Sequence, residues 1–419
     1  MAAPLVGTWR TLAALMALYA GQGLIAGLWV AILVPTLQQQ GVRIEDMIGT
    51  LAWGGLPWVL KAPAAPLIDR VCGASSGTRR RNLLLVLQLG LALCFFSVDL
   101  SDTSTSGLRA LSLTWLVANV LMSLQDVLAD AAAIDLVPDA SQGRARSLML
   151  LSSTLGAGFF GSVGLAALAR TFGAHTLGPA LSLAFVCIAA FVCLPGAGWR
   201  GRPPHREPHD AETLTPLRPL LRTAAIWSLF ALAASLGNGL VSGVAGYYLL
   251  GTLGFPIERY QTELLPAVSA VTLVVYLGLA GVLDRLGPRR WLLIGGFLTS
   301  AVWVAFAVLG TLASHDLVLF GLGIIEAVGL AVTLGALHAI LMRAAPSRLR
   351  ATFFALSMAA INLGQMVLGP MLAGVLASPI GYRGVFALAG VIHITAVTAF
   401  ARWDRIKAGA RPPRTVPSK

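Results

Sequence analysis

The sequence predicts an all-α polytopic membrane protein with twelve transmembrane helices in two six-helix repeats. Of its 419 residues, 57% are hydrophobic and 11% are charged, whereas a soluble domain carries about 25% charged residues. The mean hydropathy is +0.79, and the apolar runs approach the ~20 residues that a spanning helix needs. Inside lipid the backbone must satisfy its own hydrogen bonds, which favours helices. Transmembrane strands would instead alternate over segments of about ten residues.

The apolar segments predict a span order that divides into two equal sets. The predicted spans lie near residues 11–36, 46–66, 82–100, 108–133, 147–169, 177–195, 223–250, 262–283, 291–312, 316–342, 352–376 and 383–402. One long polar break, rich in proline, histidine and arginine, separates the sixth span from the seventh. We therefore predict an N-terminal bundle over 1–198, a linker over 199–222, a C-terminal bundle over 223–402 and a tail over 403–419.

The basic residues predict the orientation of the chain in the membrane. The formal net charge is +12. Lys61 falls within a span, five arginines fall on one side of the membrane, and the remaining lysines and arginines fall on the side of both termini; the five are Arg43, Arg109, Arg170, Arg259 and Arg383. Cytoplasmic loops carry such an excess. The prediction is an inner-membrane protein with cytoplasmic termini and linker, whose basic character reflects topology and not nucleic-acid binding.

Similar charged motifs follow the second span of each half. Asp69-Arg70 precede Arg79-Arg80-Arg81 in the first half, and Asp284-Arg285 precede Arg289-Arg290 in the second. Matching motifs at matching span numbers predict a parallel repeat, an architecture of secondary transporters. Asp69, Arg70, Asp284, Arg285 and Arg289 are candidate gate residues, because ionic contacts made in one conformation bias its population. The alternative is that these arginines serve as topological anchors.

Lys61, Asp126 and Asp130 are ionisable residues deep within predicted spans, where a charge costs about 2.5–3.5 kcal/mol on insertion scales. Lys61 precedes Asp69 by eight residues, and Asp126 and Asp130 share one face of the fourth span. At 1.5 Å per residue, Lys61 and Asp126 reach a depth of about 12–13 Å. We predict a cluster in which one carboxylate lacks a partner and exchanges a proton with the solvent. The alternative is a static salt bridge between two helices.

Other polar residues within the spans are candidates for lining a central cavity. They are Gln22, Gln125, Asn238 and Glu326, and such amides either bind solute or hold helices together. The sequence contains no HExxH, G-x-S-x-G or Walker A motif, so we expect neither an enzyme nor an ATP-driven pump, and no cofactor or metal. The expected partners are the lipid bilayer, a small-molecule solute and protons, for a monomeric protein.

Three segments resemble the AmpG-like permease group of the major facilitator superfamily. They are GQGLIAGL (Gly21–Leu28), GLPWVLKAPAAPLIDR (Gly55–Arg70) and SLQDVLADAAAIDLVP (Ser123–Pro138). The loop motif after the second and eighth spans also resembles a signature of this superfamily. The resemblance implies the major facilitator fold, import by rocking of two halves, and a cavity lined by helices 1, 4, 7 and 10. It also implies that Lys61, Gln125, Asp126 and Asp130 occupy signature positions.

Two departures from the muropeptide permeases of this group bear on the solute. Their early cation in the fifth helix is replaced here by Ser153-Thr154-Leu155-Gly156, and the chain lacks the two extra helices of some members. Both departures favour a siderophore-type solute, with a muropeptide as the alternative. A non-transporting receptor or scaffold is a third hypothesis, which the cost of charges in mid-span argues against.

Overall fold

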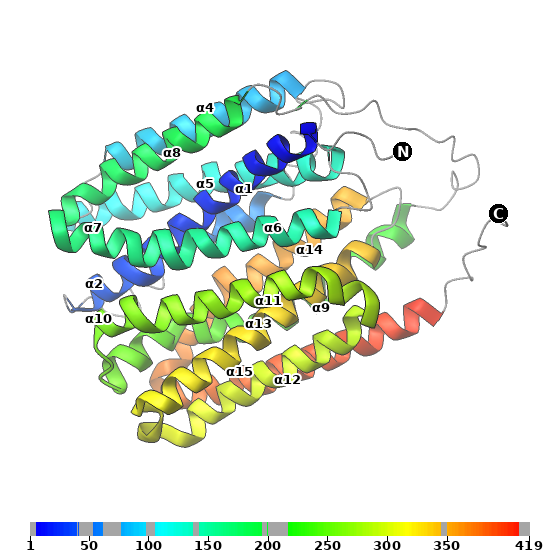
Figure 1. Cartoon of the computed structure of the whole chain (residues 1–419). Helices are drawn as coiled ribbons and strands as arrows, with labels where there is room; N and C mark the ends of the chain where they lie inside the picture. The colour runs from blue at the N-terminus through cyan, green and yellow to red at the C-terminus, as the bar shows by residue number, and fades with distance from the viewer. Residues whose placement is uncertain are drawn as a thin grey trace.

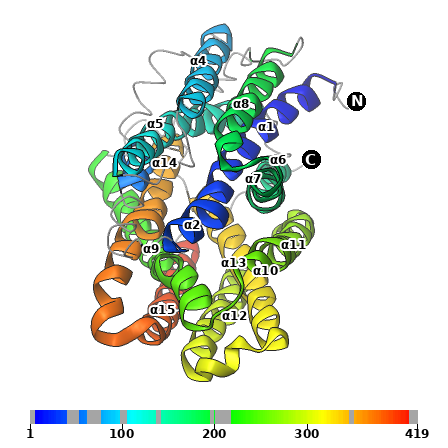
Figure 2. The same ribbon diagram turned by 90° about the vertical axis from the view of Figure 1, so that its left-hand side faces the viewer.

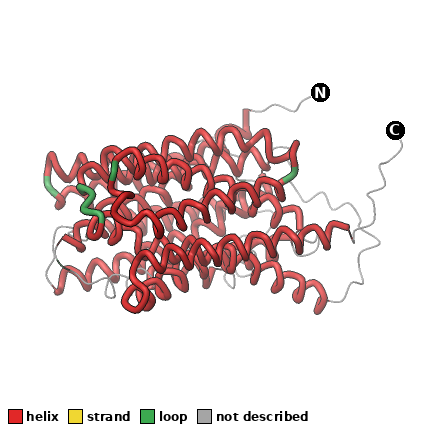
Figure 3. Tube along the Cα trace, turned by 90° about the horizontal axis from the view of Figure 1, so that it is seen from below, coloured by secondary structure: helices red, strands yellow, loops and turns green. Residues whose placement is uncertain are grey.

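The computed structural model describes residues 6–39, 41, 53–61, 77–97, 105–136, 142–194, 199, 217–344 and 350–409. Over these ranges the regular structure is helical, without strands (Figure 3). The longer α-helices of these ranges are α1 (Val6–Leu28), α4 (Gly77–Phe96), α5 (Thr105–Leu136), α6 (Gln142–Leu155), α8 (Leu177–Cys193), α9 (Leu217–Gly246), α11 (Leu265–Leu286), α12 (Pro288–Leu309), α13 (Asp316–Ala344), α14 (Arg350–Asn362) and α15 (Gly369–Gly409). Shorter helices, α2 (Val34–Gln39), α7 (Leu165–Phe172) and α10 (Ile257–Arg259), extend or connect them.

The described helices agree with a count of twelve spans. Nine helical stretches within the described ranges are long and apolar enough to cross a membrane, and the last of them, Phe353–Trp403, contains two helices that meet at Gly381. Gly381 has φ 68°, a conformation that favours glycine. The helix α4 lies within the third predicted span, and the described helical residues 53–61 lie within the second. Large apolar side chains such as Leu317 (88% exposed) and Val375 (72%) lie on the surface, as lipid contact requires.

The helices form two bundles that lie side by side. Helices α1 to α8 make up one bundle and α9 to α15 the other (Figures 1 and 2). The start of α1 and the end of α15 lie at the same end of the molecule (Figure 1), which we call the terminal end. The linker between the bundles falls largely outside the described residues, so the domain boundaries at 198, 222 and 402 stay a prediction.

The two bundles repeat the same local irregularities. A π-helical segment interrupts the first helix of the N-terminal half, η1 (Trp29–Leu33), and another ends the first helix of the C-terminal half, η5 (Tyr247–Thr252). The fifth helix of each half is interrupted in the same way, by η3 (Gly156–Gly164) and η9 (Leu363–Leu368). Glycines bring the first and fifth helices of each half together: Gly27 approaches Gly161, and Gly239 approaches Gly369. Small residues allow such close backbone approach in membranes. The repeat therefore extends beyond the charged loops to the helix packing itself.

The bundles meet along two seams. Helix α11 packs against α6 and η3, where a Cβ on Gly158 would clash with Ser269. Along the other seam, a Cβ on Gly55 would lie 2.8 Å from the carbonyl oxygen of Met366, and Asn362 donates a hydrogen bond of 3.3 Å to the carbonyl oxygen of Trp58.

The structure tests little of the predicted gate. Asp69 and Arg70 lie outside the described residues, and Asp284 and Arg285 lie in the last turn of α11 with side chains that are likewise not described. Arg289 lies half-buried in the first turn of α12, and the gate stays a prediction.

Candidate functional site

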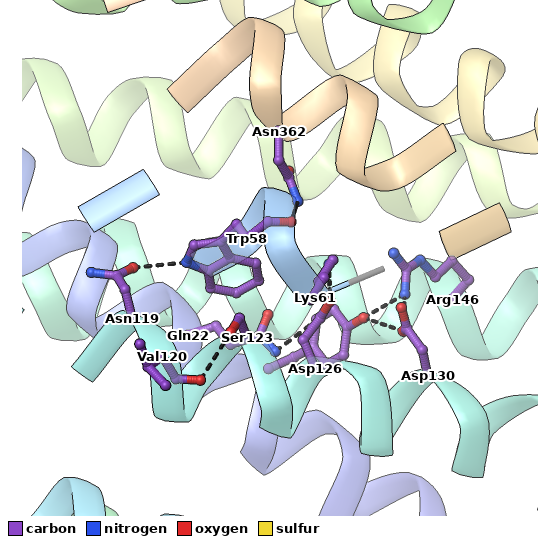
Figure 4. A network of polar contacts seen from close by, with 11 residues as sticks. Gln22, Trp58, Lys61, Asn119, Val120, Ser123, Asp126, Asp130, Arg146 and Asn362 are labelled. Carbon is purple, nitrogen blue, oxygen red and sulfur yellow. Dashed lines mark hydrogen bonds and ion pairs between the residues drawn. The ribbon is translucent and has the colours of Figure 1, made fainter. Parts of the chain in front are cut away.

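A buried ion pair joins the second and fourth helices of the N-terminal bundle. The Lys61 ammonium ends the helical stretch 53–61 and donates to Oδ2 of Asp126 on α5 (Figure 4). Each residue is 5% exposed, and Lys61 Nζ lies 5.0 Å from the centre of the Trp58 ring. The predicted contact between Lys61 and Asp126 is therefore present in the structure.

The second carboxylate has a cation of its own. Asp130, one turn further along α5, accepts a hydrogen bond of 2.6 Å from Arg146 Nη1 on α6 and one of 2.5 Å from the Tyr19 hydroxyl on α1. Arg146 also donates to Tyr19. The prediction of one cation against two carboxylates is therefore wrong. Arg146, which the sequence pattern assigned to a cytoplasmic loop, points instead into the helix bundle.

The cluster formed by Lys61, Asp126, Asp130, Arg146 and Tyr19 is thus balanced in formal charge. Its two ion pairs connect three helices of one bundle, the stretch 53–61, α5 and α6 (Figure 4). The hydrogen bonds of Tyr19 add α1 as the fourth. Buried charges are tolerated when they are paired and hydrogen-bonded. We call these five residues the charge cluster.

The charge cluster also reaches the other bundle. The Arg146 guanidinium lies 5.9 Å from the centre of the Phe354 ring on α14. A cation over an aromatic ring is attracted by the ring quadrupole. Separation of the bundles at this point would expose Arg146 to solvent.

A cavity of about 360 Å³ lies between the bundles, within the usual range for small-molecule sites of about 300–1,000 Å³. Its lining includes the aromatic residues Trp29, Trp58, Trp115, Tyr247 and Tyr260, and the amides Gln22, Asn119 and Gln365. None of its lining residues carries a formal charge. Contacts between the bundles flank it at both ends, since Gln261 donates to the carbonyl oxygen of Ala31 and Arg146 lies against Phe354.

Gln22 belongs to both the cavity and the charge cluster. It lines the cavity and donates a hydrogen bond of 3.1 Å to Asp126 Oδ1 (Figure 4). Trp58 makes a second link, because it lines the cavity, donates a 2.7 Å hydrogen bond to Asn119 and lies under Lys61. A solute in the cavity would thus lie one side chain away from the Lys61–Asp126 pair.

Three predicted cavity residues lie elsewhere. Gln125 is fully buried, donates a 3.0 Å hydrogen bond to the carbonyl oxygen of Leu18 and accepts one from Gln88, so it holds α5 to α1 and α4. Glu326 accepts a 2.6 Å hydrogen bond from Trp303 inside the C-terminal bundle. Asn238 is half-buried on α9 and is absent from the cavity lining.

The helices that line the cavity also differ from those that the resemblance implied. Helices α1, α5 and α9 contribute as expected, but α13, the tenth span, supplies no lining residue. The stretch 53–61, Tyr260 and the η9 turn supply residues in its place. The cavity lies on the far side of the charge cluster from the terminal end, because its lining residues follow Gln22 along α1 and precede Asp126 along α5.

Replacement of Gln125 by leucine should destabilise the protein without a specific effect on transport. The change leaves the buried Gln88 amide without its acceptor, which costs about 1–3 kcal/mol. Unfolding in mixed micelles should begin at lower denaturant, whereas uptake per folded molecule should be unchanged. Ser112→Ala on the same helix is the control, since Ser112 bonds within its own helix to the carbonyl oxygen of Leu108. A loss of uptake at full stability would return Gln125 to the solute path.

Arg146 and Tyr19 are the site residues that the sequence analysis missed. Asp130 lies six residues before the end of α5, and Arg146 lies four residues after the start of α6. At 1.5 Å per residue these depths agree to within about 3 Å. This measure of depth, which paired Lys61 with Asp126, could also have paired Arg146 with Asp130. Tyr19 had no comparable signal, because tyrosines are common on helix faces.

Comparisons with known proteins agree with this architecture. The model of the Major Facilitator Superfamily matches residues 11–283 and 232–417. The anhydromuropeptide permease of Escherichia coli strain K12 is 24% identical over 361 residues, covering 83% of this chain and 72% of the permease. The same permease of Escherichia coli O157:H7 matches to the same extent.

Solved structures match in fold. A human organic anion transporter, TETRAN, aligns with a TM-score of 0.66 at 15% identity, covering 94% of this chain and 98% of its own. A bacterial homolog of the human lysosomal transporter Spinster, in an inward-facing and occupied conformation, aligns with a TM-score of 0.66 at 16% identity, covering 98% and 100%. With the family model matching most of the sequence, this chain belongs to the Major Facilitator Superfamily.

Proposed function

We propose that this transporter is a proton-coupled importer of the inner membrane that carries a medium-sized polar solute and works as a monomer, with the terminal end in the cytoplasm. The observation that carries the proposal is the contact between the cavity and the charge cluster through Gln22. A solute that draws Gln22 away removes one hydrogen bond from Asp126. Loss of that hydrogen bond shifts the equilibrium of Asp126 from the ionised carboxylate, paired with Lys61, toward the protonated form.

The coupling step depends on the ion pairs, since both carboxylates have cationic partners. Protonation of Asp126 or Asp130 removes the attraction that holds Lys61 or Arg146. Arg146 also contacts Phe354 of the other bundle, so its release loosens a seam between the bundles. The alternative, a static pair that holds helices together, predicts loss of stability with no loss of coupling.

The features of the cavity favour a solute rich in hydroxyl and amide groups. Aromatic rings and amides line it without formal charges, a lining that fits polar uncharged groups with apolar faces. Arg146 supplies a cation on the fifth helix. The absence of a cation at Ser153–Gly156 is therefore a weaker argument against a muropeptide. The similarity to an anhydromuropeptide permease points the same way, so a muropeptide replaces a siderophore as the first solute to test.

Uptake into proteoliposomes tests this function. Radiolabelled anhydromuropeptide should accumulate when the pH gradient is imposed in the direction of uptake and should only equilibrate when a protonophore is added. A ferric siderophore serves as the second solute, and empty liposomes serve as the control. Failure of both solutes to enter would refute the proposed solute classes. Accumulation that ignores the protonophore would refute proton coupling.

A further inference from the structure

One amide side chain joins the two bundles at the end of the molecule opposite to the terminal end, which we call the distal end. Gln261 lies in η6 (Tyr260–Leu264), and its Nε2 donates a hydrogen bond to the carbonyl oxygen of Ala31 in η1. Helices α2 and α10, which adjoin these two segments, lie at the distal end (Figure 1). Gln261 is half-buried, and its neighbour Tyr260 lines the cavity. The bond therefore lies where the wall of the cavity passes from one bundle to the other.

The sequence of the first helix explains why the Ala31 carbonyl group accepts a hydrogen bond from outside that helix. The helix continues from η1 into α2, and in an α-helix the N–H of residue 35 would donate to the carbonyl oxygen of residue 31. Residue 35 is proline, which has no N–H. Ala31 is fully buried, and a buried carbonyl group is costly to leave without a donor. Gln261 of the other bundle supplies a donor in place of the missing N–H.

The segment that carries Gln261 is fixed to its own bundle. Arg259 in α10 donates hydrogen bonds of 3.0 Å to both carboxylate oxygens of Asp316 at the start of α13, and it also pairs with Glu263 one turn later. Bidentate pairs between arginine and a carboxylate fix geometry. When the C-terminal bundle moves, it therefore carries Gln261 with it, and movement away from the N-terminal bundle must break the bond to Ala31.

A neutral hydrogen bond suits a contact that opens and closes. Water replaces such a bond when it breaks, so one bond shifts an equilibrium by only about two- to tenfold. A buried ion pair at the same place would leave two charges to be separated in each opening, at a much higher cost. The contact between Gln261 and Ala31 is thus strong enough to bias the closed state and weak enough to be broken.

We propose that Gln261 is the distal gate of the cavity, the residue that holds it closed on the side from which solute enters. Its bond to Ala31 forms when the bundles close at the distal end and breaks when they part there, so it helps to set the share of molecules that accept solute. Pro35 is the second element of the gate, because it leaves the Ala31 carbonyl oxygen available. The inference rests on the proposed import through this cavity, to which it adds a contact outside the charge cluster.

The test measures distances in the absence of solute. Spin labels are placed at Thr171→Cys on α7 and Thr311→Cys in η7 (Gly310–Ser314), two exposed positions of different bundles at the distal end. Serine replaces the native cysteines, which are Cys72, Cys94, Cys187 and Cys193. Pulsed electron paramagnetic resonance of the full chain is recorded in lipid nanodiscs at constant pH. Gln261→Met and Gln261→Leu remove the donor, and each should raise the ratio of long to short distances by about two- to tenfold.

Three further variants distinguish a gate from a general loosening of the protein. Pro35→Ala should give a smaller rise in the ratio, because the new N–H competes with Gln261 for the same carbonyl oxygen. Thr262→Val is the matched control and should leave the ratio unchanged, since the Thr262 hydroxyl bonds within its own segment. Phe354→Ala should lower the ratio, because it removes a contact that joins the bundles nearer the terminal end.

The proposal is overturned if each Gln261 variant that folds keeps the wild-type ratio, or if Phe354→Ala raises the ratio as Gln261→Met does. Unfolding midpoints in mixed micelles identify the variants that fold. A wild-type ratio in Pro35→Ala would remove Pro35 from the gate. Because neither solute nor a pH gradient is present, a failed uptake assay together with a ratio that depends on Gln261 would count against the proposed solute or proton coupling and not against the gate.

Discussion

Removal of one partner of the Lys61–Asp126 pair should destabilise the protein strongly, and removal of both should restore stability but not coupling. Loss of one charge leaves the other buried and unpaired, which costs about 3–5 kcal/mol, whereas apolar replacement of both is often neutral. We therefore expect Lys61→Met and Asp126→Leu to lower the free energy of unfolding by that amount singly. The double variant should unfold close to wild type and fail to accumulate solute against its gradient.

Two measurements distinguish a coupling pair from a structural one. The midpoint of unfolding in mixed micelles reports stability, and proteoliposomes report both gradient-driven accumulation and solute exchange at equal pH. Glu263→Gln is the control, because the Arg259–Glu263 pair is exposed and exposed pairs contribute little to stability. If the stable double variant still accumulates solute as wild type does, the pair is a static helix clamp and the proposed coupling site is wrong.

A single methyl group added at Gly23 should prevent normal packing of the N-terminal bundle. A Cβ at this position would overlap the carbonyl oxygen of Ser153 and lie 2.8 Å from the backbone nitrogen of Ala157. Overpacking typically costs about 1–3 kcal/mol and more where nothing can move, and here the obstacle is backbone. We expect Gly23→Ala to lose about 3 kcal/mol or more, visible as a lower unfolding midpoint and a lower yield of folded protein.

The repeat provides a second test and the chain provides a control. Gly239 makes a similarly close approach in the C-terminal bundle, where a Cβ would lie 2.3 Å from the carbonyl oxygen of Gly364, so Gly239→Ala should be similarly destabilising. Gly278→Ala on α11 is the control, because a Cβ there meets nothing within 4 Å. An unfolding midpoint for Gly23→Ala equal to that of Gly278→Ala would show that the first and fifth helices are not this close.

The sequence by itself determined the membrane class, the order of the spans, the parallel repeat and the pairing of Lys61 with an acidic residue of the fourth span. These follow from local quantities: hydropathy along the chain, charge in the loops and the rise per residue of a helix. The same quantities could have placed Arg146 at the depth of Asp130, but they could not say whether it faced solvent or the bundle. Neighbouring arginines in one loop have the same hydropathy and differ only in the helix face that carries them.

The tertiary structure decided which polar groups share a site. Rotation of α5 turns Gln125, a candidate for the cavity, toward α1 and α4, and turns the adjacent Asp126 toward Lys61. The packing of the two bundles brings Asn362 into hydrogen-bond distance of the carbonyl oxygen of Trp58, 304 residues earlier. Which side chains meet depends on the rotation of each helix and on contacts between segments that are distant in the sequence. Burial makes this arrangement matter, because an unpaired charge is tolerated in water but is strongly unfavourable between packed helices.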